Sequence, residues 1–104
     1  MNLFLNGQLF IMFCKYGKVE GVKEFLSLGL NPAVDNQICI KLSSENGQFE
    51  VVRLLLKDKR IDPSHAGNFA VNKAIENGHL KVVNLLLENK KVKELYDTKK
   101  FCWY

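Results

Sequence analysis

The side chains that could take part in chemistry are few in this sequence, and they lie far apart. It contains two histidines, His65 and His79, and three cysteines, Cys14, Cys39 and Cys102. Catalysis and metal binding need convergent groups, such as a nucleophile beside a base or a cluster of ligands. Neither histidine has a second ligand near it in the sequence, and the cysteines are odd in number and form no C-x-x-C pattern. We therefore expect no enzyme activity, no metal site and no disulfide framework, in a reducing, intracellular setting.

Cofactor binding is not indicated either. The stretch "GNFAVNK" has one glycine and lacks the G-K-[ST] of a phosphate-binding loop. His65 follows a proline-containing turn and is expected to be solvated. Cys14 and Cys39 fall in apolar stretches, where a free cysteine packs as a small apolar residue.

The length and composition predict one small folded domain. The 104 residues are 47% hydrophobic and 25% charged, with a formal net charge of +4. The lysines are scattered among acids, which favours a solvated surface over a nucleic-acid site. The apolar N-terminus has neither the basic start nor the small-residue cleavage site of a signal peptide. No apolar run approaches the roughly 20 residues that span a bilayer, so we expect no membrane segment.

The chain repeats itself. Residues 45–58 are "ENGQFEVVRLLLKD" and residues 76–89 are "ENGHLKVVNLLLEN", with E-N-G, V-V and L-L-L at the same positions. Gly17, Gly47 and Gly78 open equivalent segments, 30 and 31 residues apart. The sequence therefore contains three copies of a unit of roughly thirty residues.

Each unit is predicted to be a pair of helices. After each glycine, apolar residues recur at i, i+3, i+6 and i+7, as Val19, Val22, Phe25 and Leu26 do in the first copy. A second apolar stretch precedes each glycine. The predicted unit is thus helix, tight glycine turn, helix.

The units are separated by turns and must stack. Asn-Pro at residues 31–32 and Asp-Pro at residues 62–63 interrupt the helical pattern, and Asn36 and Asn68 are placed to cap the next helices. One helix pair cannot close a core, so neighbouring copies must bury each other's apolar faces. We predict one domain over residues 1–104, with repeat 1 at about 5–34, repeat 2 at about 35–65, repeat 3 at about 66–93 and a C-terminal cap or tail at 94–104.

The segments "ENGHLKVVNLLLENK", "ENGQFEVVRLLLKDK" and "SLGLNPA" resemble the second half of the ankyrin repeat. The resemblance covers roughly residues 7–93. It implies an all-α, ankyrin-like solenoid of stacked helix-turn-helix repeats with short loops or β-turns between them. It also implies that His79, in the turn between two helices, has a structural role.

The sequence departs from the ankyrin pattern in two ways. The T-P-L-H-x-A opening of the first helix is replaced by "QLFIMF", "ICIKLS" and "FAVNKA". The spacing is also shorter than the 33 residues usual for the family. We therefore expect the projecting fingers between repeats to be stunted.

The resemblance implies a non-catalytic adaptor or scaffold that binds a protein partner, with no cofactor. By position in the family, its loop tips and the concave face of the first helices would bind the partner. The corresponding residues are Val34, Asp35, Gln37, Glu45 and Asn46 in the second repeat, and His65, Ala66, Asn68, Glu76 and Asn77 in the third.

The two ends raise a different possibility. The first helix carries more apolar residues than one face can hold, so it is predicted either to fold back on itself, to bind a partner or to form a homodimer through Phe4, Phe10 and Phe13. Self-assembly through this helix is the alternative function. At the other end, Leu95 and Tyr96 are expected to lie in a capping helix or in a frayed tail. A cap would have these residues, with Phe101 and Trp103, pack over Leu80, Val83 and Leu87.

Overall fold

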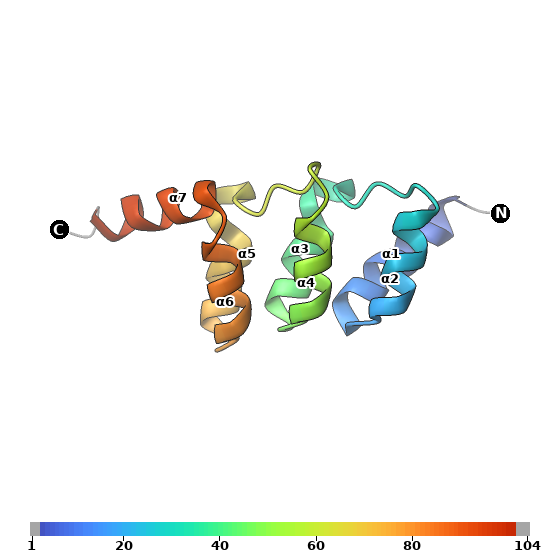
Figure 1. The fold of residues 1–104 in the computed structure, drawn as a ribbon, viewed down its shortest axis with the longest axis horizontal. Coiled ribbons are helices and arrows are strands. Elements are labelled where there is room, and N and C mark those ends of the chain that lie inside the picture. The colour runs from blue at the N-terminus through green and yellow to red at the C-terminus, as the bar shows by residue number, and fades with distance from the viewer. Residues whose placement is uncertain (1–2, 102–104) are drawn as a thin grey trace.

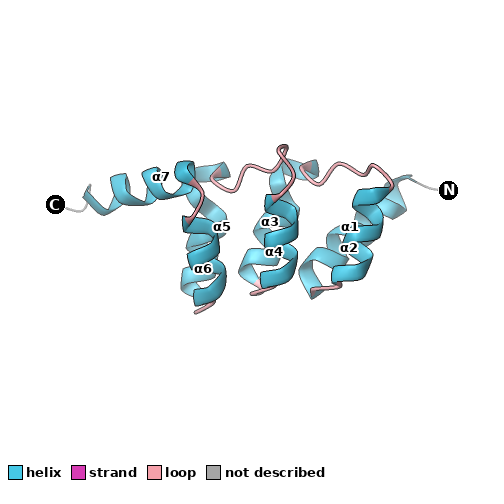
Figure 2. Ribbon diagram, in the orientation of Figure 1, coloured by secondary structure: helices cyan, strands magenta, loops and turns pink. Residues whose placement is uncertain are grey.

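The protein is described by a computed structural model that places residues 3–101, with side chains for residues 7–98. In this part of the chain helices are joined by turns and loops, and there is no strand (Figures 1 and 2). The all-α fold predicted from the sequence is confirmed. Its helices are α1 (Leu3–Tyr16), α2 (Val19–Ser27), α3 (Val34–Glu45), α4 (Phe49–Leu56), α5 (His65–Glu76), α6 (Leu80–Leu87) and α7 (Lys90–Phe101).

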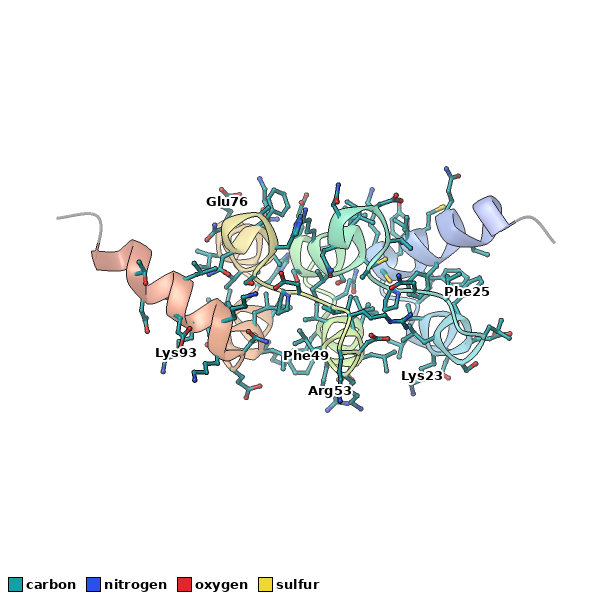
Figure 3. The ribbon with its side chains drawn as sticks, turned by 90° about the horizontal axis from the view of Figure 1, so that it is seen from above. Lys23, Phe25, Phe49, Arg53, Glu76 and Lys93 are labelled. Carbon is teal, nitrogen blue, oxygen red and sulfur yellow. The ribbon has the colours of Figure 1, made fainter. Side chains whose placement is uncertain are left out.

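The helices form three antiparallel pairs that stand side by side along the long axis of the molecule (Figure 1). Helices α1, α3 and α5 make one layer, and α2, α4 and α6 make the other (Figure 3). The core lies between the layers and between neighbouring pairs, because each pair leaves apolar side chains that only its neighbour can cover. Its largest fully buried apolar side chains are Phe10, Val22, Ile40, Val51, Val52, Leu55, Val71, Val82, Leu86 and Val92.

A glycine makes the turn within each pair. Gly17, Gly47 and Gly78 have φ of 72°, 71° and 73°, a left-handed conformation that favours glycine. The amide of the following residue donates to a carbonyl five residues back, as in the 2.9 Å bond from His79 N to Ala74 O. The bond closes the end of the first helix, and the second helix starts two residues after the glycine.

The connections between pairs end in an unusual backbone turn. Residues 35–37 and 66–68 all have φ between 51° and 67°, so right-handed helix resumes only after Gln37 and Asn68. The expectation that Asn36 and Asn68 cap these helices is wrong. An N-cap residue normally has negative φ, whereas φ is 56° at Asn36 and 67° at Asn68.

Helix α7 leaves the stack instead of covering its end. It starts at Lys90, beside the C-terminus of α6, and extends along the long axis away from α5 and α6 (Figure 1). Its Val92 is fully buried, whereas Leu95 is 36% exposed and Leu80 is 71% exposed. The expectation that this segment covers Leu80 is therefore wrong, because Leu80 lies at the opposite end of α6. Trp103 and Cys102 lie outside the described residues.

Candidate binding surface

The outward sides of α1, α3 and α5 form one continuous surface, which we call the first-helix face. It lies opposite the second-helix layer: Glu76 on α5 points away from Lys23 and Arg53 on the far side (Figure 3). Each side chain of this face is two positions along its helix from a buried residue. Two positions correspond to a rotation of about 200° about the helix axis, so the side chain points away from the core. The residues of the first-helix face are Met12, Tyr16, Lys41, Leu42, Phe69, Lys73 and Glu76.

Phe69 is a partly exposed aromatic residue of the first-helix face, on α5 beside α3. Its ring is partly exposed and is contacted by two lysines, with Lys41 Nζ 5.4 Å and Lys73 Nζ 5.6 Å from the ring centroid. Lys41 comes from the neighbouring repeat, and Lys73 also pairs with Glu76 at 3.1 Å. The ammonium groups are attracted by the π-face of the ring. The ring is therefore held in place as an apolar group with cationic neighbours.

The predicted residues at the turn edge lie on the rim of this face. Glu45 and Asn46 end α3, and Glu76 and Asn77 end α5, and all four side chains are at least partly exposed. Asn77 Nδ2 donates to Glu45 O at 2.9 Å and so links the two repeats. The structure brings these four residues together, and it leaves both carboxylates accessible.

The other six predicted residues lie at the opposite edge of the face, which adjoins the loops between repeats and which we call the loop edge. They are Val34, Asp35, Gln37, His65, Ala66 and Asn68. Since an α-helix rises about 1.5 Å per residue, the two edges of the face are roughly 15 Å apart. The ten predicted residues therefore do not form one patch. Asp35 and Ala66 are exposed and Val34 and His65 are partly exposed, whereas Asn68 is only 1% exposed.

The two amide side chains at this edge bind the chain itself. Gln37 Nε2 donates to Arg60 O at 3.1 Å, and Gln37 Oε1 accepts from Asp62 N at 2.9 Å. In the next repeat Asn68 Nδ2 donates to Val92 O at 2.8 Å. The prediction that Asn68 binds a partner is wrong, because this side chain is buried. Gln37 fastens the following loop, and its amide is occupied by that loop.

A family model for ankyrin repeats, in three copies, matches residues 9–97. The chain belongs to the ankyrin repeat family. Ankyrin repeats are in general protein–protein interaction modules, and the family is typically non-catalytic. Neither the curated proteins nor the solved structures contain a match. In this ankyrin stack, residues 28–33 and 57–64 make turns between repeats and contain no strand.

Phe69, Lys41 and Lys73 of the ankyrin first-helix face were not among the binding residues predicted from the sequence. Phe69 was assigned to an apolar stretch, and apolar residues in a helix are more often core than surface. The available signal was spacing: Phe69, Lys73 and Glu76 stand at i, i+4 and i+7 on one side of α5. The predicted Glu76 therefore shares this side of α5 with Lys73 and Phe69.

The predicted self-association residues are largely covered. Phe10 is fully buried, with its ring edge-to-face against Phe25 at 5.9 Å. Phe13 packs on the same ring at 5.7 Å, over Gly21, which has no side chain in that space. The expectation that Phe10 forms a dimer interface is wrong, because it fills the core of repeat 1. The side chain of Phe4 lies outside those described.

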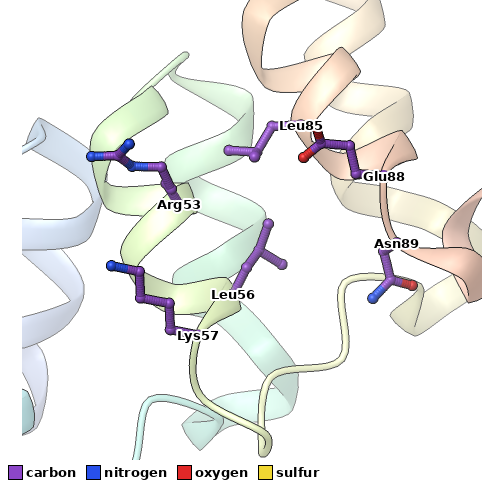
Figure 4. Close-up of a pocket in the computed structure, with 6 residues that line it drawn as sticks. All are labelled: Arg53, Leu56, Lys57, Leu85, Glu88 and Asn89. Carbon is purple, nitrogen blue, oxygen red and sulfur yellow. The ribbon is translucent and has the colours of Figure 1, made fainter.

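The second-helix face of the ankyrin stack carries a shallow groove between α4 and α6 (Figure 4). Its volume is about 300 Å³, and Leu56 and Leu85 lie between charged groups there. The groove contains no nucleophile beside a base. Across the described residues no three His, Cys, Asp or Glu side chains gather as a metal site, and no helix there is long and apolar enough to cross a membrane. The residues that line the groove are Arg53, Leu56, Lys57, Leu85, Glu88 and Asn89.

Proposed function

We propose that this ankyrin chain is a non-catalytic adaptor that binds a protein partner through the first-helix face, with Phe69 as the central contact. The observation that carries the proposal is the partly exposed Phe69 ring, which Lys41 and Lys73 contact. Aromatic side chains are enriched in protein interfaces and supply much of their binding energy. A partner segment that presents an apolar side chain beside a carboxylate fits this centre.

The two edges of the first-helix face extend this proposed site. Glu45, Asn46, Glu76 and Asn77 form the turn edge, where two carboxylates favour a basic group on the partner. At the loop edge, Val34, Asp35, His65 and Ala66 provide partly exposed side chains for contact. The partner would then contact the acidic Glu45 and Glu76 beside the cationic Lys41 and Lys73. This arrangement of charges would favour one orientation of the bound partner.

Photo-crosslinking in cells tests the proposal. A photo-reactive amino acid replaces Asn72, one turn from Phe69, and in a matched control it replaces Asn84 on α6. We expect one defined protein adduct from position 72 that Phe69→Ala weakens at least tenfold, and none from position 84. Equal adducts from both positions, or an adduct that Phe69→Ala leaves unchanged in a folded protein, would refute this site.

Self-association through the open end of repeat 1 is the second candidate. Leu9 is 40% exposed there, whereas the residues at the equivalent positions, Cys39 and Ala70, are at most 1% exposed. Light scattering across a dilution series separates the two candidates. A dimer that Leu9→Lys dissolves supports self-assembly, and a monomer at all concentrations excludes it.

We place the chain inside the cell, in a reducing compartment, since its cysteines suggest no disulfide framework. Nucleic acid remains the less favoured partner. Lys90, Lys91 and Lys93 on α7 would give binding that falls steeply with salt. Absent or salt-insensitive binding to single and double strands would dismiss it.

A further inference from the structure

Two cysteines meet inside the interface between the first two repeats. Cys14 lies on α1 and Cys39 on α3, and both are fully buried. The two helices pack against each other, and the Cys39 thiol is close enough to raise the pKa of Cys14, so the two side chains are neighbours across the interface. Neither forms a disulfide in the structure.

The next interface has no such pair at the same positions. Because the repeats are 30 and 31 residues apart, Cys14 corresponds to Ser44 and Cys39 corresponds to Ala70. Ser44 is buried, and its hydroxyl oxygen has no hydrogen-bond partner. The fold therefore needs a small residue at each position, but it does not need sulfur at either.

We propose that Cys14 and Cys39 form an oxidisable pair whose disulfide fastens repeat 1 to repeat 2. The oxidant is a low-molecular-weight disulfide such as oxidised glutathione. One cysteine thiolate attacks it, releases one glutathione thiol and forms a mixed disulfide; the second thiolate then attacks the protein sulfur and releases the other glutathione. The two protein thiols lose their hydrogens, and one glutathione disulfide is reduced to two thiols.

The folded interface keeps this pair unreactive until repeat 1 opens. The hydrogen bond with Cys39, together with burial, raises the pKa of Cys14, and the thiolate is the reactive form. Within the described residues repeat 1 packs on one side, against repeat 2, so we expect it to open before the rest of this stack unfolds. Brief opening exposes both thiols, and closing brings them together again.

Once formed, the bond ties α1 to α3 and closes a loop of about 25 residues, which restricts the open state. We expect the opening of repeat 1 to become at least about tenfold less frequent. The oxidised chain would then hold Met12 and Tyr16 in place on α1. The disulfide itself does not depend on the proposed partner site.

The test uses the full chain with Cys102→Ser, so that the third cysteine cannot react. The protein is incubated with oxidised glutathione, digested without reduction and mapped by mass spectrometry. Hydrogen exchange of the α1 amides is measured before and after oxidation. Controls carry Cys14→Ser or Cys39→Ala, the residues that the equivalent positions already hold. We expect an intramolecular Cys14–Cys39 peptide and at least about tenfold slower α1 exchange, and neither in the controls.

Three results would overturn the proposal. The first is thiols that stay free under conditions that oxidise the denatured chain. The second is a stable mixed disulfide or a cross-linked dimer in place of the internal bond. The third is an internal disulfide that leaves α1 exchange unchanged or makes it faster, because the bond would then not fasten the repeat.

Discussion

The imidazole of His79 lies directly over Gly47 of the preceding repeat, so close that a Cβ on Gly47 would stand 2.5 Å from His79 Nδ1. Gln48 covers Gly17 in the same way, and its Nε2 also donates to Lys15 O at 3.0 Å. In both cases the covering residue follows the glycine of its own turn. The stack therefore closes each turn with a side chain from the next repeat, which gives His79 its structural role.

Substituting these glycines by alanine should separate backbone strain from this contact. Gly47 and Gly78 have nearly the same φ, 71° and 73°, but nothing lies within 4 Å of a Cβ on Gly78. Gly78→Ala should lower the free energy of unfolding by about 1–2 kcal/mol, the cost of left-handed alanine. Gly47→Ala should lower it by about 1–3 kcal/mol more, because His79 must move. Urea denaturation measures both, and equal losses would show that His79 does not constrain Gly47.

Phe13 and Gly21 should be energetically coupled. The ring of Phe13 occupies the space that a side chain at position 21 would need. Repeat 3 has the opposite arrangement at the equivalent positions, with Ala74 and Val82 both buried. We expect Phe13→Ala and Gly21→Val each to destabilise the protein, and the double variant to recover about 1–3 kcal/mol of the summed loss. Simple additivity in thermal or urea denaturation would contradict this packing.

The period of the sequence was enough to predict the repeats. Gly17, Gly47 and Gly78 each end one helix and start another, as predicted, because a tight turn with positive φ depends on local chemistry. The all-α ankyrin fold followed from that pattern and is confirmed. The sequence was therefore sufficient to predict features that depend on local backbone conformation, such as the glycine turns and the helices on either side of them.

Features that depend on distant parts of the chain were missed. Asn68 looked like a helix cap, but its amide bonds Val92 O, 24 residues later. Phe10 looked like excess apolar surface, because its cover, the ring of Phe25, comes from the next helix. Phe69 looked like core, because the lysines that flank it lie on two helices. Each error concerns the direction of a side chain, which the packing of neighbouring helices decides.

Asn68 should anchor helix α7. Its bond to Val92 O is buried, so Asn68→Ala removes a buried hydrogen bond between α5 and α7, at a cost of about 0.5–1.5 kcal/mol. Asn72→Ala is a matched control, because its 3.3 Å bond to Gly67 O is exposed and its loss should cost about 0.5 kcal/mol or less. Hydrogen exchange should also speed up in α7 for the first variant alone. Similar effects of the two substitutions would argue against the anchor.

The acid sensitivity of the stack should depend on Asp58. Its carboxylate accepts bonds from Arg60 Nε at 3.0 Å, Nη2 at 2.8 Å and the Arg60 amide at 2.9 Å. The side-chain bonds with Arg60, followed by the backbone bond, lower the pKa of Asp58 to about 2. The unfolded value is about 3.9, so the folded protein favours the ionised form. This contribution to stability is present above pH about 4 and is lost as the pH falls toward about 2.

Asp58→Asn should therefore lower the free energy of unfolding slightly near neutrality, leave it almost unchanged at pH about 2, and so flatten its fall between pH about 4 and about 2. The pair is partly exposed, so the difference should be small and should shrink further in high salt. Asp62 keeps a separate acid dependence, because the hydrogen bond from Ser64 lowers its pKa as well. Arg60→Ala should flatten the same pH range, and adding it to Asp58→Asn should change nothing more. Urea denaturation at a series of pH values measures this, and a variant that retains the full acid dependence would show that the Asp58–Arg60 pair does not contribute.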